Sequence, residues 1–225
     1  MDIIEIDILL KNRLDDIKFK LYYDYLIERN QHINLTNITS FEDVYEKHFY
    51  DSVFISTVID LQDKTLLDIG AGAGFPSIPN RIIENSLKVT IVDGLSKRIN
   101  FLKELCEILD ISNVSLIHGR AEELSKKEAF DIVTARAVAK LNVLSEIALP
   151  FVKKNGYFAA FKSINFESEL QEANRAISIL GGEVEKVFLY KINEEIIHSL
   201  ILIKKIKSTP NIYPRAFAKI KKTPL

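Results

Sequence analysis

The sequence of 225 residues predicts an α/β protein with a doubly wound, mostly parallel, Rossmann-like sheet. From residue 65 onward, short apolar runs alternate with longer amphipathic stretches, which is typical of strand–helix–strand units. A glycine-rich segment at 70–74 directly follows the first apolar run, as in loops that cradle a nucleotide-like cofactor. The last two apolar runs, 183–190 and 196–205, are joined by a polar turn and predict a terminal antiparallel hairpin.

Residues 1–60 are expected to form a helical N-terminal cap, with no strand before Thr65. Apolar side chains recur in this segment at spacings of three and four, which predicts an amphipathic helix. These side chains are Leu10, Leu14, Ile17, Leu21 and Tyr25. The polar stretch 30–39 is expected to be a loop, and Ser40 with Asp43 predicts the capped start of another helix.

Residues 61–205 are expected to form the sheet domain, and 206–225 a basic tail. The expected strands before the hairpin are 65–69, 88–93, 114–118, 130–135 and 157–161. The expected helices are 75–84, 96–109, 121–127, 140–152 and 166–180. This alternation predicts right-handed crossovers and a parallel sheet with helices on both faces.

The composition, 47% hydrophobic and 27% charged, is that of a globular protein. One cysteine excludes an internal disulfide and favours the reducing cytoplasm. Because Cys106 shares the apolar face of the helix expected at 96–109, we interpret it as a core residue and not a nucleophile. The acidic N-terminus does not resemble a secretory signal, and no apolar run is long enough for a membrane span. The four histidines lack ligand-like spacing, so we expect no metal, and a monomer is the default expectation.

The charge distribution separates the tail from the rest of the chain. The net charge is −1, but no acid follows Glu195. The positive residues after it are Lys204, Lys205, Lys207, Arg215, Lys219, Lys221 and Lys222. A basic arm on a mildly acidic body can bind a phosphate backbone. A solvated, partly disordered tail is the alternative interpretation.

The glycine-rich loop indicates which cofactor is bound. Gly70, Gly72 and Gly74 stand at every second position, preceded by Asp68. Phe75 occupies the third glycine position of the G-x-G-x-x-G dinucleotide fingerprint, which disfavours a nicotinamide dehydrogenase. The pattern instead resembles motif I of the class I S-adenosylmethionine-dependent methyltransferases.

Three further strand ends carry candidate cofactor residues. Asp93 lies 23 residues after Gly70, a distance suited to an acid that accepts hydrogen bonds from ribose hydroxyls, although it could also cap the next helix. Ala121 and Glu122 could contact an adenine edge or simply begin a helix. Arg136 could hold the cofactor's carboxylate or a substrate phosphate, with a structural salt bridge as the alternative.

Several segments together resemble the RsmG family of 16S ribosomal RNA guanine-N7 methyltransferases, also called glucose-inhibited division protein B. The segments are 34–38, 46–52, 67–79, 118–123, 134–139 and 213–215. The resemblance implies S-adenosyl-L-methionine as cofactor and methyl transfer to N7 of one guanosine in the small ribosomal subunit. It also implies cofactor contacts at Gly70, Phe75, Ala121, Glu122 and Arg136. Ser77 replaces a usual glycine, and 216–219 replace a tail that usually contains Pro-Gly.

Guanine N7 carries a lone pair and no proton, so its methylation needs no general base. Catalysis would then depend on proximity and alignment, and no catalytic residue is assigned beyond a possible positioning role for Arg136. The basic residues expected to contact RNA are Lys47, His48, Lys97, Arg98, Lys162, Arg215, Lys219, Lys221 and Lys222. The alternatives are a class I methyltransferase with another substrate and a non-catalytic ribosome- or division-associated factor.

Overall fold

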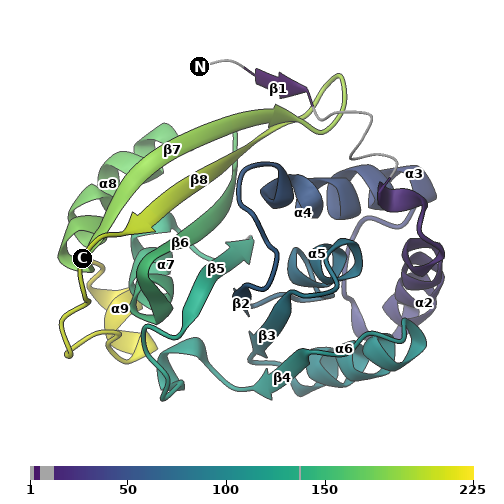
Figure 1. Cartoon of the computed structure of the whole chain (residues 1–225), viewed down its shortest axis with the longest axis horizontal. Coiled ribbons are helices and arrows are strands. Elements are labelled where there is room, and N and C mark those ends of the chain that lie inside the picture. The colour runs from purple at the N-terminus through teal and green to yellow at the C-terminus, as the bar shows by residue number, and fades with distance from the viewer. Residues whose placement is uncertain (1–2, 6–12, 137) are drawn as a thin grey trace.

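The computed structural model describes residues 3–5, 13–136 and 138–225, and its central feature is a sheet with strand order β1-β7-β8-β6-β5-β2-β3-β4 (Figure 1). The strands are β1 (Ile3–Glu5), β2 (Thr65–Ile69), β3 (Lys88–Asp93), β4 (Val114–His118), β5 (Phe130–Arg136), β6 (Val152–Ser163), β7 (Gly182–Lys191) and β8 (Ile197–Lys205). Strand β8 is antiparallel to β6 and β7, whereas the other pairings are parallel. The expected doubly wound sheet with its antiparallel hairpin is therefore confirmed.

Helices cover both faces of the sheet (Figure 1). They are α2 (Ile17–Ile33), α3 (Phe41–Val44), α4 (Asp51–Val53), α5 (Ser77–Ile83), α6 (Ser96–Ile108), α7 (Leu141–Ala148), α8 (Glu167–Ile179) and α9 (Phe217–Lys222), with a π-helical segment (Tyr45–Tyr50) between α3 and α4. Successive residues of a strand point to opposite faces. Leu66 of β2 accordingly packs into the core under α2, α5 and α6, whereas Leu67 packs into the core under α7, α8 and α9.

The N-terminal cap and the tail share these two cores with the sheet. Phe19 and Tyr22 of α2 belong to the first core together with Phe101 of α6. Ile220 of α9 is fully buried in the second core. Within the described parts of the chain, no helix combines the length and apolar character that a membrane crossing requires.

The structure corrects two expectations for the N-terminal segment, the absence of a strand and the start of the loop at residue 30. Strand β1 pairs in parallel with β7, so the expectation that no strand precedes Thr65 was wrong. Helix α2 continues to Ile33, and the loop begins only at Asn34, whose φ of 47° is left-handed. Asn30 appeared to be a loop residue because it is polar, but its Oδ1 accepts the Leu35 and Thr36 N–H groups from within the helix.

The buried face of α2 also differs from the expected stripe. The fully buried side chains are Phe19, Tyr22 and Leu26, whereas Ile17 and Leu21 of the expected stripe are exposed. Leu10 lies outside the described residues. The expected cap at Ser40 is confirmed, because its Oγ accepts the Asp43 N–H at 3.3 Å.

In the sheet region, β2, β3 and β4 have the expected bounds. Strand β6 is longer than expected because Val152 already pairs with Phe130 ahead of an irregularity in the register. The helix expected over 121–127 is only a 3-10 turn, Ala121–Glu123, since Leu124 is extended.

Candidate cofactor and substrate site

A cleft of about 410 Å³ opens where β2, β3 and β4 end. Its lining includes four of the expected cofactor residues, Gly70, Asp93, Ala121 and Glu122. Apolar side chains form much of the remaining wall; they are Ile69, Val92, Leu95, Val138, Ile147 and Phe217. A largely apolar cleft with a few polar groups at the carboxyl ends of parallel strands is the usual site of a small ligand in an open α/β sheet.

The glycine-rich loop makes hydrogen bonds with Asp93 at the end of β3 and with Tyr22 of α2. Its three glycines, Gly70, Gly72 and Gly74, all have positive φ. The Gly72 N–H donates to Oδ2 of Asp93 at 3.2 Å. A Cβ at position 74 would lie 2.7 Å from the Tyr22 hydroxyl, which donates to the Ala73 carbonyl. Side chains of Ile78 on α5 and Leu102 on α6 approach position 74 equally closely, so the protein itself packs against Gly74.

Asp93 is almost fully buried at the end of β3, and its carboxylate has three donors. Oδ1 accepts the Leu95 N–H at 2.9 Å, whereas Oδ2 accepts Gly72 N–H and lies 3.4 Å from Nη1 of Arg98. Asp93 lines the cleft but does not cap α6, because its carboxylate accepts the N–H of Leu95, which precedes the helix, and no side chain caps the first turn of α6. Arg98 had been expected to contact RNA, but the structure brings it into this cleft.

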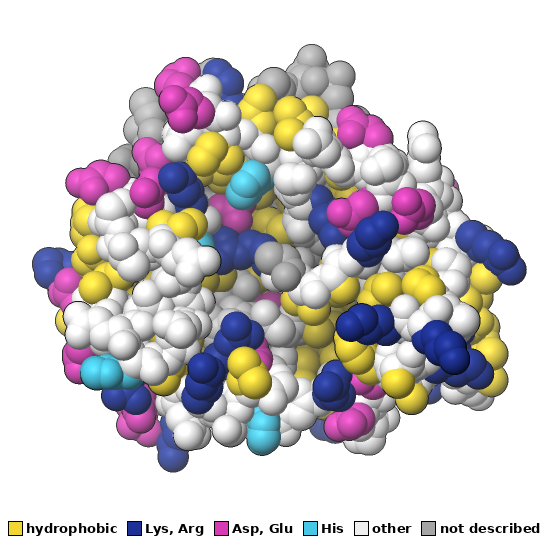
Figure 2. All heavy atoms as spheres, turned by 180° about the vertical axis from the view of Figure 1, so that it is seen from behind, with side chains coloured by type: hydrophobic (Ala, Val, Ile, Leu, Met, Phe, Trp, Pro, Cys, Tyr) yellow, Lys and Arg dark blue, Asp and Glu magenta, His cyan; other side chains and the backbone are white. Residues whose placement is uncertain are grey.

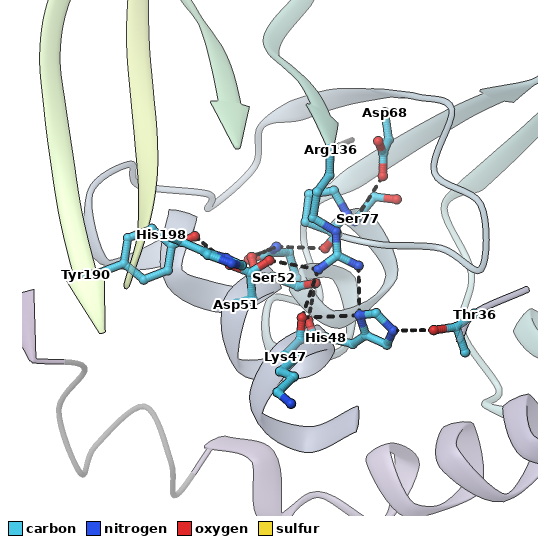
Figure 3. A network of polar contacts seen from close by, with 12 residues as sticks. Thr36, Lys47, His48, Asp51, Ser52, Asp68, Ser77, Arg136, Tyr190 and His198 are labelled. Atoms are coloured by element: carbon cyan, nitrogen blue, oxygen red, sulfur yellow. Dashed lines mark hydrogen bonds and ion pairs between the residues drawn. The ribbon is translucent and has the colours of Figure 1, made fainter. Parts of the chain in front are cut away.

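Asp68 lies on β2 and reaches the far end of the glycine-rich loop. Its Oδ2 accepts the Ser77 N–H at 3.1 Å (Figure 3). Its Oδ1 is buried without a hydrogen-bond partner. Burial raises the pKa of Asp68 to about 7, because a charged carboxylate is poorly solvated there.

Arg136 connects the end of β5 to the N-terminal cap (Figure 3). Its Nη1 donates to Oδ2 of Asp51 at 2.8 Å, and its guanidinium lies 4.9 Å from the centre of the Phe75 ring. Asp51 is 1% exposed and also accepts hydrogen bonds from Tyr190 and His198 of the terminal hairpin. Burial alone would raise the pKa of Asp51, but the hydrogen bond from His198 and the charge of Arg136 hold it below its usual value.

His48 lies between Arg136 and the loop after α2. Its Nδ1 is 3.2 Å from Nη2 of Arg136, and its Nε2 is 2.7 Å from Oγ1 of Thr36. Nδ1 also lies 3.2 Å from the Lys47 carbonyl oxygen, so this ring nitrogen faces one donor and one acceptor. Burial, with the adjacent Arg136 charge, lowers the pKa of His48 to about 4. His48 is a neutral component of the interior and does not offer a charge to RNA.

Five of the expected cofactor residues do not line the cleft. They are Asp68, Gly72, Gly74, Phe75 and Arg136. The Phe75 side chain is 4% exposed and stacks against Tyr22 and His48 beneath the loop. Ala137, next to Arg136, lies outside the described residues.

The remaining basic candidates differ in their surroundings. Lys162 is 2.6 Å from Glu169, and Arg215 Nε donates to Glu146 at 2.6 Å, so both are used within the protein. Lys47 forms an ion pair with Asp43 at 2.6 Å. The candidates that are exposed are Lys97, Lys219, Lys221 and Lys222.

No sequence pattern assigned Asp51, His198 or Phe217 to the site. Asp51 lies in a segment that carries the family resemblance, which was a usable signal. His198 and Phe217 offered none, because their roles depend on tertiary contacts. In the described parts of the chain, no group of His, Cys, Asp and Glu side chains is arranged to hold a metal ion.

Two features of the cleft and one of the buried Asp68 behind the glycine-rich loop suit S-adenosylmethionine. Gly94 and Gly119 present bare main chain, since a Cβ at either would meet no atom within 4 Å. Asp93 supplies a carboxylate at the position of a ribose diol. The unpartnered Oδ1 of Asp68 suits the cationic amino group at the other end of the molecule.

The strand order and the cleft define a class I methyltransferase fold. The chain resembles the crystal structure of M. jannaschii TYW2 in complex with AdoMet, with a TM-score of 0.60 and 17% identity, over 76% of this chain and 80% of that one. It also resembles a SAM-dependent methyltransferase from Aquifex aeolicus, with a TM-score of 0.55 and 18% identity, over 72% and 92% of the two chains. At these identities the likeness concerns the fold alone.

The sequence comparisons identify the family. The family described as rRNA small subunit methyltransferase G matches residues 15–198. Relatives named ribosomal RNA small subunit methyltransferase G are 50% identical in Lactobacillus helveticus and 49% identical in Bacillus subtilis. Each match covers 92% of this chain and 90% of the relative. The chain belongs to this family, and it is an S-adenosylmethionine-dependent methyltransferase.

Proposed function

We propose that this protein transfers a methyl group from S-adenosylmethionine to N7 of a guanosine in small-subunit ribosomal RNA. The observation that carries the proposal is the cleft at the ends of β2, β3 and β4, with Asp93 and bare glycine backbone on its wall, in a chain of this family. The cofactor supplies the methyl group on a sulfonium centre.

Residues that line the cleft, and Asp68 and Arg136 outside it, suit different parts of the cofactor. Asp93 would accept hydrogen bonds from the ribose hydroxyls, and Ala121 with Glu122 would contact the base. Gly70 lines the same cleft at the end of β2, the strand that lies between β3 and β5 in the sheet. Asp68 would attract the amino group, and Arg136 would favour the adjacent carboxylate through its positive charge.

The polar groups around Arg136 suit an acceptor that needs no deprotonation. Asp51 accepts hydrogen bonds from Arg136, Tyr190 and His198, and neutral His48 lies between Arg136 and Thr36. These groups satisfy each other, so none of them is available as a general base. Because N7 of guanine already carries its lone pair, alignment of base and methyl group is sufficient, and Arg136 acts as a positioning residue.

RNA binding is proposed at the basic rim of the cleft. Arg98 and Arg120 line the cleft, and Lys97 is exposed at the start of α6. Helix α9 adds three exposed lysines; they are Lys219, Lys221 and Lys222. Lys and Arg side chains also gather below the central hollow in Figure 2. Such a rim would bind phosphates while the target base enters the cleft.

We further propose that the substrate is the small ribosomal subunit and that the protein acts in the cytoplasm as a monomer. The name of the relatives, ribosomal RNA small subunit methyltransferase G, supports this substrate. Sedimentation of the protein alone is expected to give a single species of the monomer mass of 25.7 kDa.

The direct test is methyl transfer in vitro from labelled S-adenosylmethionine to small-subunit particles that lack the modification. We expect label at N7 of one guanosine, identified by nuclease digestion and mass spectrometry. Asp93→Ala should reduce cofactor affinity at least about tenfold, because it removes charge-assisted hydrogen bonds. Asp60→Ala, at an exposed surface position, is the matched control.

Two results would contradict the proposed function. Label on a small molecule or protein, with none on RNA, would identify a methyltransferase with another substrate. Failure of the wild-type protein to bind S-adenosylmethionine or S-adenosylhomocysteine would indicate a non-catalytic factor.

A further inference from the structure

The C-terminal segment contributes a side chain to the cofactor cleft. Phe217, the first residue of α9, lines the cleft together with Arg120 and Glu122. The Arg120 guanidinium lies 5.0 Å from the centre of the Phe217 ring, a cation–π arrangement. We propose that Phe217, braced by Arg120, is the aromatic wall against which the adenine ring of the cofactor packs. This inference rests on the proposed function.

The position of Phe217 corresponds to the base end of the ligand. Asp93 at the end of β3 marks the ribose, and the glycine-rich loop lies on its β2 side. The base must therefore extend to the opposite side, toward the end of β4. Gly119, Arg120, Ala121 and Glu122 follow β4, and Phe217 lines the cleft with them.

Contacts within the protein hold Phe217 in this place. Arg215 donates from its N–H and Nε to Oε1 of Glu146, whose side chain on α7 is fully buried. Arg215 Nη2 also donates to the Thr223 carbonyl at 3.1 Å, which joins the two ends of α9. Ile220, on the same short helix, is fully buried in the second core. The aromatic wall is therefore formed before a ligand arrives, which reduces the entropic cost of binding.

The two sides of α9 have different chemistry. Phe217 and Ile220 face the protein, whereas Lys219, Lys221 and Lys222 are exposed. An aromatic ring stacks on a purine face, while ammonium groups attract phosphates. Cofactor binding and RNA binding by this segment should therefore be separable by substitution.

The chain contains no tryptophan, so Phe217→Trp creates a single fluorescent reporter at the proposed adenine wall. We expect S-adenosylhomocysteine to change the fluorescence of this variant, and 5′-methylthioadenosine, which lacks the amino-acid end, to do the same. The matched control is Phe188→Trp on β7, whose parent ring is also half-buried and lies 4.8 Å from a lysine, Nζ of Lys186. Its fluorescence should not respond to either ligand.

Calorimetry with S-adenosylhomocysteine provides the second measurement. Phe217→Ala should weaken binding about tenfold, whereas Phe217→Tyr should bind as the wild type does. Joint replacement of the three α9 lysines by alanine should leave this affinity unchanged while weakening RNA binding.

The results separate this inference from the proposed function. Wild-type binding together with unchanged fluorescence of the Phe217→Trp variant, or with undiminished affinity in a folded Phe217→Ala protein, would overturn the adenine wall alone. Absence of binding by the wild-type protein would overturn both. If Phe217→Ala does not fold, the fluorescence response of the Phe217→Trp variant decides.

Discussion

At the scale of single residues, the two acids beside the glycine-rich loop are held in different ways. Asp93 has three hydrogen-bond donors around its carboxylate. Asp68 has one, and its other oxygen is buried without a partner. Desolvation therefore dominates at Asp68 and raises its pKa to about 7. A buried carboxylate in this state gains from a cationic ligand group, which is the role proposed for it.

Because the pKa of Asp68 is raised, Asp68→Asn should change how the free energy of unfolding depends on pH. Between the unfolded pKa of about 4 and the folded value of about 7, the folded wild-type protein binds more protons than the unfolded chain. The free energy of unfolding contributed by Asp68 is therefore present at low pH and is lost as the pH rises through 7. We expect the free energy of unfolding of the variant, relative to that of the wild type, to rise by on the order of 3 kcal/mol from pH 5 to pH 8. Urea unfolding at the two pH values measures this change.

The control for this measurement is Asp60→Asn at an exposed position, which should give the same difference from wild type at both pH values. Parallel pH profiles of wild type and Asp68→Asn would refute the account of Asp68. The same variant should also bind S-adenosylmethionine more weakly, because the partner of its amino group is lost.

At the scale of elements, the bounds of strands β2, β3 and β4 could be predicted from the sequence. Strand β2 is buried on both faces, so a short segment rich in apolar residues marks it, although Asp68 interrupts that segment, and the glycine-rich loop marks its end. The three residues of β1 are too few to show a periodicity, and their pairing with β7 joins opposite ends of the chain. The Ala-Glu-Glu sequence at 121–123 starts a helical turn as expected. The backbone of Leu124 is extended, so the turn ends there and no longer helix forms.

The charge pattern of the tail, residues 206–225, did not indicate that the tail packs against the rest of the protein. Charge alone suggested an arm, yet Arg215 is bonded to a carboxylate that is fully buried. Removal of one partner from such a pair leaves an uncompensated charge in the interior.

We therefore expect Arg215→Ala to lower the free energy of unfolding by about 3 kcal/mol in urea denaturation. Adding Glu146→Gln should recover part of this loss, because the buried charge is removed. Lys222→Ala, on the exposed side of α9, should change stability by less than about 0.5 kcal/mol. An Arg215→Ala protein as stable as the wild type would show that the tail is not anchored by this pair.

At the scale of the whole molecule, the site is assembled from every part of the chain. Asp51 in the N-terminal cap binds Arg136 of the central sheet and Tyr190 and His198 of the terminal hairpin (Figure 3). Gly70, Asp93, Ala121 and Glu122 were predictable because they follow strand ends. The partners of Arg136 and the role of Phe217 were not, since each depends on contact between segments far apart in the sequence.

The central claim is that this protein modifies one guanosine of the small-subunit ribosomal RNA. The most direct measurement is mass mapping of that RNA from cells with and without the gene, and from cells complemented with wild type or Asp93→Ala. We expect one N7-methylguanosine to disappear without the protein, to return with the wild type and to remain absent or strongly reduced with Asp93→Ala. An unchanged set of N7-methylguanosines in cells without the protein would contradict the claim.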